Sequence, residues 1–288
     1  MMRAVLISSL ALTTLSAPAL AQVSGAQSMF DRNRNVSVMD RPRPEYDGGG
    51  IQNGALIFYP ELTLGLEYTD NVFGASSNEE SDVVAIITPS VAFETTWSRH
   101  AVTGDASVTR REYFDFSDES VWNATAGLAG KLDVDGATSL EAGARYSDLT
   151  EPRTSAGAAG QAAEPIEYDT LTAFFGAMRA SGRFRLQGRV DYGQYDYSDA
   201  ALFGGGIADQ DFRDRDQFIY MARGDYAVSP DTAVFLRAQA NTREYDLAPP
   251  AVGLLRDSDG YTVDVGADFD INGVARGVIG VGYMEQSY

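Results

Sequence analysis

Long segments in which apolar and polar residues alternate constrain this chain more than any other feature of its sequence. From Tyr261 to Ile271 every second residue is apolar, and the residues between them are polar or small. The segments 183–193 and 138–147 alternate in the same way. Side chains of a strand point to opposite faces with a period of two, whereas a helix would scatter the same charges around its axis. The pattern therefore predicts β-strands.

Eleven such strands are expected. They cover 56–69, 82–97, 100–112, 120–132, 138–147, 168–180, 183–193, 215–228, 232–245, 260–271 and 275–288. At roughly 11–15 residues each, they are about twice as long as the usual strand of a soluble domain. Crossing the hydrocarbon of a bilayer takes about 9–11 tilted residues, so strands of this length can span a membrane.

The connections between these segments alternate between two classes. Short turns are expected at 98–99, 133–136, 181–182, 229–231 and 272–273, and all but the first contain Gly, Pro, Asn or Asp. Longer polar loops are expected at 70–81, 113–119, 150–167, 198–214 and 246–258. Short turns at one end and long loops at the other are typical of outer-membrane barrels. The sequence therefore predicts an all-β fold, an antiparallel transmembrane β-barrel.

The distribution of aromatic residues indicates which face meets lipid. Aromatic residues on the apolar face gather near the two ends of the strands, as in the interfacial girdles of a barrel. The predicted girdle consists of Tyr68, Trp122, Tyr146 and Tyr192 near the long loops and Trp97, Phe184, Tyr226 and Phe269 near the short turns. An arginine at the bilayer midplane costs about 2–4 kcal/mol, so the charged face must point inward.

Charges of both signs on that inward face are the candidate lumen residues. The set consists of Glu141, Arg145, Arg185, Arg189, Asp191, Arg223, Asp225, Arg237, Arg243, Asp264 and Asp268. These side chains could line a hydrated passage and set its selectivity. Alternatively, they pair across strands and fill the interior. Inward glycines such as Gly127 and Gly143 would leave open volume, although glycine also serves bends and bulges.

The chain divides into three parts by sequence. Residues 1–21 have a positive residue, an apolar run and a small-residue cleavage site, so they read as a secretory signal peptide. Residues 22–54 form an irregular polar lead-in, which we expect to be a periplasmic segment, and residues 55–288 form the barrel. The odd strand number, with the chain stopping at Tyr288 after the eleventh strand, leads us to expect a barrel that is incomplete at its C-terminus, because bacterial barrels have an even number of strands.

Composition excludes several kinds of chemistry. Acidic residues outnumber basic ones by 41 to 22, giving a net charge of −19, which argues against nucleic acid as a partner. The absence of Cys excludes thiol catalysis and Cys-based zinc sites. His100, the only imidazole, lies at an expected short turn and not where a general base is needed. Asp257-Ser258-Asp259-Gly260 lacks the other ligands of a calcium loop and reads as a turn. We expect no enzyme activity, catalytic residue, metal or cofactor.

Several short pieces of sequence resemble one family. They are 59–73 (YPELTLGLEYTDNVF), 89–91 (PSV), 97–100 (WSRH) and 282–288 (GYMEQSY). Together they resemble the β-barrel porin type 2 family, from about Gly54 to the last residue, and Asp70-Asn71-Val72-Phe73 is the most specific piece. The resemblance implies an outer-membrane barrel of a Gram-negative bacterium, often associated with exopolysaccharide export. It implies no catalytic residues, and members that continue beyond the equivalent of Tyr288 agree with an incomplete barrel.

Two classes of function follow. The leading hypothesis is porin-like transport or exopolysaccharide export across the cell outer membrane. The alternative is a structural or adhesive barrel with a filled lumen and functional surface loops. An enzyme and a soluble β protein rank lower. The expected partners are outer-membrane lipid and lipopolysaccharide, polysaccharide or small solutes and, for an export role, components of the envelope export machinery.

Overall fold

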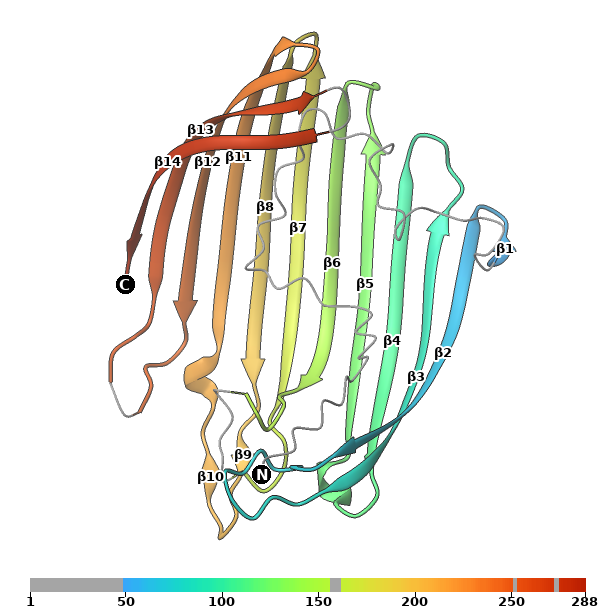
Figure 1. Cartoon of the computed structure of the whole chain (residues 1–288), viewed down its shortest axis with the longest axis vertical. Helices are drawn as coiled ribbons and strands as arrows, with labels where there is room; N and C mark the ends of the chain where they lie inside the picture. Colours follow the sequence, from blue (N-terminus) through green and yellow to red (C-terminus); the bar gives the residue numbers. More distant parts are fainter. Residues whose placement is uncertain (1–48, 156–161, 251–252, 272–274) are drawn as a thin grey trace, which may run out of the picture.

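The computed structural model describes residues 49–155, 162–250, 253–271 and 275–288, and they form a twelve-stranded antiparallel sheet (Figure 1). Its strands are β1 (Ile51–Asn53), β2 (Leu56–Thr69), β3 (Asp82–Thr95), β4 (Ala101–Tyr113), β5 (Val121–Asp133), β6 (Thr138–Thr150), β7 (Glu167–Ser181), β8 (Phe184–Tyr197), β11 (Arg215–Ser229), β12 (Thr232–Tyr245), β13 (Ser258–Ile271) and β14 (Ala275–Ser287). A separate hairpin, β9 (Ala200–Ala201) and β10 (Ile207–Ala208), and two 3-10 turns, η2 (Ser117–Glu119) and η3 (Asp211–Arg213), lie in the connections. The predicted signal peptide and residues 22–48 fall outside the described residues.

The all-β antiparallel prediction is confirmed, and the eleven long strands coincide with the eleven predicted segments. The differences lie at the ends. The strand predicted at 183–193 continues to Tyr197, and Ser258–Gly260 already belong to β13 rather than to a turn. Residues 51–53 form β1, a short strand paired with β2, within a segment that we expected to be irregular. Polar residues at strand ends carry too little hydrophobic signal to mark such boundaries.

Each strand pairs with the next strand in the chain, apart from β8, which pairs with β11 because the β9–β10 hairpin stands out from the sheet. The short turns lie at one end of the sheet and the long connections at the other, where Figure 1 shows β9 and β10. We call these the short-turn end and the long-loop end. Gly182 adopts a φ of +59° in the two-residue turn after β7, a conformation that non-glycine residues rarely adopt.

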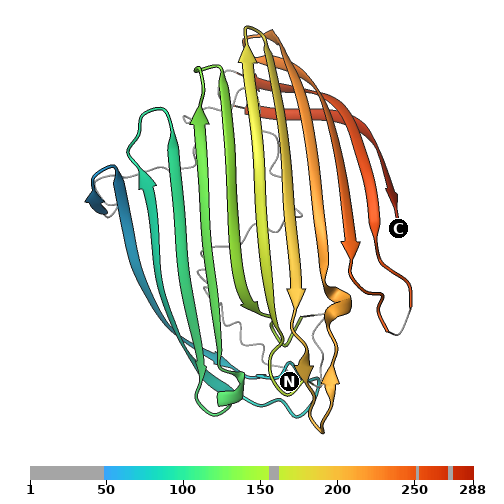
Figure 2. The ribbon, with the colours of Figure 1, turned by 180° about the vertical axis from the view of Figure 1, so that it is seen from behind.

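The sheet is strongly curved. In Figure 1 the short-turn ends of β13 and β14 bend across the near face, and Figure 2 shows the same segments behind the sheet, so Figure 1 looks onto the concave face. Among the described residues β1 pairs only with β2 and β14 only with β13, so no ladder joins the two edges. The arrangement is the wall of an up-and-down barrel. No helix among these residues is long and apolar enough to cross a membrane.

The apolar residues of this sheet lie on its outside. Leu64, Leu66 and Val281 are 68%, 77% and 74% exposed, and side chains of the same parity on the other long strands are likewise apolar and exposed. Few apolar residues of the described chain are buried, and three of them, Ala162, Ile166 and Ala200, pack together in the long-loop region. A soluble protein does not leave an apolar face this large in water, whereas a barrel wall presents one to lipid.

Two single substitutions to arginine, at adjacent residues whose side chains point to opposite faces, test this assignment. Leu64→Arg puts the charge on the apolar face and should lower the free energy of unfolding in lipid vesicles by about 2–4 kcal/mol. Thr63→Arg puts it on the opposite face, near Glu61, and should have little effect. Urea denaturation of both variants measures the difference, and equal losses would contradict the assignment of the faces.

Candidate functional site

Strand register places the predicted lumen charges on one face of the sheet. Arg185 lies opposite Asp225 in the β8–β11 ladder, and Arg223 lies opposite Arg237, which in turn lies opposite Asp264. The exposed apolar side chains occupy the other parity of the same strands. The same register places the rest of the set, Glu141, Arg145, Arg189, Asp191, Arg243 and Asp268, on this inner face. That the set lines a passage stays a prediction.

Glycines let inner-face charges from next-but-one strands meet. Asp105 on β4, Gly127 on β5 and Arg145 on β6 form one row across the sheet, and the Arg145 guanidinium reaches Asp105 with Nη2 to Oδ1 at 2.5 Å. A Cβ on Gly127 would lie 2.8 Å from that guanidinium. Any larger residue at this position would therefore displace the arginine from the ion pair.

The next such row has the same design. Gly176 on β7 lies between Glu141 on β6 and Arg189 on β8, and Arg189 Nη1 lies 3.3 Å from Glu141 Oε1. Arg189 also pairs with Asp191 at 2.6 Å and stacks 4.0 Å above the centre of the Phe174 ring. Inward glycines therefore serve here as crossing points for side chains as well as a source of open volume.

Sequence reasoning missed several charged members of this wall, and three of them form ion pairs across it. Asp105 on β4 pairs with Arg145, and Arg111 on β4 pairs with Glu67 on β2 at 3.0 Å. The parity of the segments 56–69 and 100–112 carries the signal that would have found them, because it places all three side chains on the polar face. Parity does not show which side chains meet across an intervening strand.

A buried network of charges joins β8, β11 and β13. Arg223 Nη2 lies 2.7 Å from Asp225 Oδ1 and 2.8 Å from Asp268 Oδ2, while Arg185 Nε lies 3.1 Å from Asp225 Oδ2. These four side chains are at most 9% exposed, and Arg223 also stacks on the Phe235 ring. Because a buried charge is stable only when paired, each member of the network depends on the others.

Removing the arginine at the centre of this network should be costly. Arg223→Gln leaves Asp268 without its cation and Asp225 with one instead of two, which should lower the free energy of unfolding by about 3–5 kcal/mol. The matched control is Arg243→Gln on the neighbouring strand, an exposed arginine with no carboxylate partner among the described residues. Urea midpoints in vesicles should fall for the first variant and stay unchanged for the second.

A hollow of about 430 Å³ lies on the inner face between β4 and β8. Hydroxyl groups and paired charges line it together with apolar residues, among them Leu128, Leu149 and Phe174. Its polar lining consists of Thr103, Ser147, Tyr168, Thr170, Thr172 and Tyr195 with Asp105, Arg145, Arg189 and Asp191. Such groups hydrogen-bond well to hydrated or hydroxylated solutes, and paired charges present both donors and acceptors.

The aromatic residues predicted to form girdles lie at the two ends of the wall. Tyr68 is next to last in β2, and Trp122 is second in β5, both beside long connections. At the short-turn end the rings of Phe184 and Tyr226 lie 4.8 Å apart on the outer face. Tyr146 and Tyr192 lie toward the long-loop end, and Trp97 and Phe269 toward the short-turn end. Their interfacial role stays a prediction.

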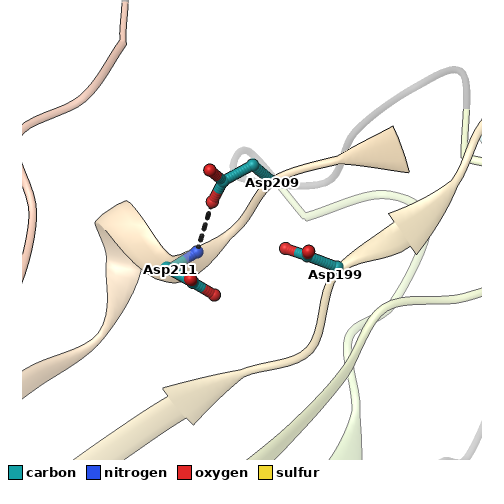
Figure 3. A group of neighbouring side chains, drawn as sticks. All are labelled: Asp199, Asp209 and Asp211. Carbon is teal, nitrogen blue, oxygen red and sulfur yellow. Dashed lines mark hydrogen bonds between the residues drawn. The ribbon is translucent and has the colours of Figure 1, made fainter. Parts of the chain in front are cut away.

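One group of carboxylates in the long-loop region could hold a metal ion. Asp199, Asp209 and Asp211 bring one oxygen each to within 4.8 Å of the others (Figure 3). All three are exposed, and two of them already accept backbone hydrogen bonds, Asp199 from Gln210 and Asp209 from Asp211. Exposed acidic groups of this kind are common without a metal ion, so this group does not define a metal site.

Two further residues considered from the sequence have structural contacts. His100 lies in the short turn before β4, as predicted, where its Nδ1 accepts a hydrogen bond of 3.3 Å from the Asp133 backbone. Asp257 accepts a hydrogen bond of 2.8 Å from the Tyr245 backbone nitrogen. Within the described part of the chain, neither residue belongs to a group of potential metal ligands.

Acidic crowding at the long-loop end perturbs carboxyl groups outside the strands, and Asp214 is the clearest case. The pKa of Asp214 is raised to about 6, mainly by burial of the carboxyl group. The negative charges of Asp196, Asp211 and Asp246 raise it further. A hydrogen bond from the Tyr197 backbone nitrogen opposes them. Because the folded state holds this proton more tightly than the unfolded state, stability must fall as pH rises from about 4 to about 6.

Asp214→Asn keeps the acceptor for Tyr197 and removes the charge. In this variant the free energy of unfolding should fall less between about pH 4 and 6 than in the wild type. The difference should be about 1 kcal/mol or less, because solvent screens this partly exposed group. Asp135→Asn is the control of opposite sign, since hydrogen bonds from Thr138 and Ala137 lower the pKa of Asp135 and its contribution is lost as pH falls. Urea midpoints across this pH range measure both, and identical pH profiles for wild type and Asp214→Asn would contradict the assignment.

Comparison with known proteins agrees with this architecture. The family described as "Putative beta-barrel porin 2" matches residues 43–288, and the chain belongs to that family. No curated protein matches significantly. Among solved structures, the copper transporter OprC matches with 13% identity and a TM-score of 0.47 over 79% of this chain and 41% of that one. The chain thus spans about two fifths of the OprC structure, and a likeness at this level says nothing about copper. The fold is that of an outer-membrane β-barrel.

Proposed function

We propose that the protein is a porin-like channel of the outer membrane that passes hydrophilic solutes. The observation that carries the proposal is the inner-face hollow of about 430 Å³, whose mixed lining includes hydroxyl groups and paired charges. A solute that leaves water must replace its hydration, and these side chains offer alternating donors and acceptors for that purpose. The exposed apolar outer face supports a location in lipid, with the long-loop end toward the outside and in contact with lipopolysaccharide.

Export of exopolysaccharide is the more specific form of this proposal. Polysaccharides are rich in hydroxyl groups, and the Thr, Ser and Tyr hydroxyls of the hollow are suited to them. Reduced surface polysaccharide in a deletion strain, restored by the wild-type chain, is the expected result. Such export implies partners in the envelope export machinery, which cross-linking in cells would detect.

Conductance in planar lipid bilayers tests the channel directly. The purified protein should give single-channel steps in concentrated KCl. Thr172→Trp fills the hollow and should lower the step size, because a narrower passage carries fewer ions. Leu171→Trp, one residue away on the outer face, is the matched control and should leave the step size unchanged.

A structural or adhesive barrel with a filled lumen is the second candidate, and the ion pairs that cross the inner face favour it. Arg145–Asp105 and Arg189–Glu141 each reach over a strand and occupy space inside the wall. Absence of any conductance, together with loss of surface attachment after shortening the 198–214 connection, would select this candidate over the channel.

A further inference from the structure

Three arginines of the described chain form a group without carboxylate partners. Arg215, Arg243 and Arg256 all lie at the long-loop end of β11, β12 and β13, and none makes an ion pair. Ten of the eleven predicted lumen charges, by contrast, are paired with a group of opposite sign, and Arg243 is the exception. In a chain with a net charge of −19, unpaired arginines gathered in one place require a physical reason.

Aromatic rings hold these guanidinium groups in place. Arg215 lies in one row with Tyr195 and Tyr245, and its Cζ lies 4.0 Å from the centre of the Tyr195 ring and 5.9 Å from that of Tyr245. Arg256 covers Tyr245 at 4.4 Å. Arg243 lies one pair further along the inner face, and its Nη2 donates to Gln217 Oε1 at 3.4 Å, its one side-chain hydrogen bond among the described residues. Stacking on an aromatic face orients an arginine without using its hydrogen-bond donors.

Two carboxylates next to these arginines in the sequence accept backbone hydrogen bonds, and those of Asp216 and Glu244 belong to the opposite parity of β11 and β12. Asp214 precedes Arg215 but accepts a hydrogen bond of 2.7 Å from the Tyr197 backbone nitrogen. Asp257 follows Arg256 but accepts one from the Tyr245 backbone nitrogen. Arg256 Nη2 donates to the Phe212 carbonyl at 2.7 Å and Arg215 Nη1 to the Arg213 carbonyl at 3.2 Å, which leaves further donors on each guanidinium. Arg243 and Arg256 are exposed and have no carboxylate counter-charge among the described residues. Grouped like charges repel one another, and a bound anion would relieve that repulsion.

We propose that Arg215, Arg243 and Arg256 form a binding station for an anionic solute bearing a carboxylate or phosphate. A guanidinium presents paired N–H donors that match both oxyanions. Tyr195 belongs both to this station and to the inner-face hollow, so an anion held here stands at the entrance to the hollow. The station rests on the proposed channel function and gives it a substrate class.

Block of the KCl current in planar bilayers measures anion binding at the station. Glucuronate is the carboxylate probe, inorganic phosphate is the phosphate probe and glucose is the neutral control. Either anion should reduce the KCl conductance at millimolar concentration, whereas glucose should not. The double variant Arg243→Gln/Arg256→Gln should raise the half-blocking concentration about tenfold or more, because it removes charge-assisted hydrogen bonds. Arg183→Gln is the matched control, an exposed arginine in the β7–β8 turn with no ion pair among the described residues, and should not change the block.

The outcomes separate the station from the channel. Steps of normal size with no block by either anion, or with equal block in the double variant, would overturn the station and leave the channel intact. Absence of steps would overturn the channel. Isothermal titration of the refolded protein with both anions then tests the station by itself. Tenfold weaker binding by the double variant supports the station, whereas equal binding by the double variant, or undetectable binding by the wild type, refutes it. Agreement of heat-dependent gel mobility shows that all variants fold.

Discussion

Backbone hydrogen bonding in lipid is the constraint on which the rest of this structure depends. A strand in hydrocarbon has no water to satisfy its N–H and C=O groups, so each must pair with a neighbouring strand. Nine of the eleven long strands, β3 to β8 and β11 to β13, meet this requirement by pairing with a long strand on both sides, and β8 skips the β9–β10 hairpin to reach β11. Among the described residues β2 and β14 lie at the edges of this array. Pairing along the whole strand fixes the register, and the register decides which parity meets lipid and which forms the inner wall.

The inner wall then has to accommodate charges of both signs, some of them buried. Charges pair there because an isolated charge costs more than the pair, and the curvature of the sheet brings side chains of next-but-one strands together. Gly127 and Gly176 clear the path for two of these pairs. Arg223 links Asp225 with Asp268 across β12 in a third contact of this kind. The arginines left unpaired at the long-loop end therefore lack the electrostatic stabilisation that the other charges of the wall obtain from their partners.

Much of the fold was predictable because its signal is local and repeated. Strict alternation located each long strand to within a few residues, as for 232–245, which is the observed β12. The Gly182 turn was predictable because few residues tolerate its positive φ. The β9–β10 hairpin and β1 were not, since two or three residues are too few to show a period. The site was predictable only as a face: parity put Arg145 and Arg189 on one side but could not identify Asp105 and Glu141 as their partners.

The sequence by itself determined the strands, the length classes of their connections and the division of side chains between a lipid face and a polar face. These follow from a period of two and from turn chemistry, both of which act between near neighbours in the chain. Only the tertiary structure decided which charges neutralise one another and which remain free. That outcome depends on register and curvature across strands dozens of residues apart, as in the 2.5 Å contact between Asp105 and Arg145 and the stacking of Arg256 on Tyr245.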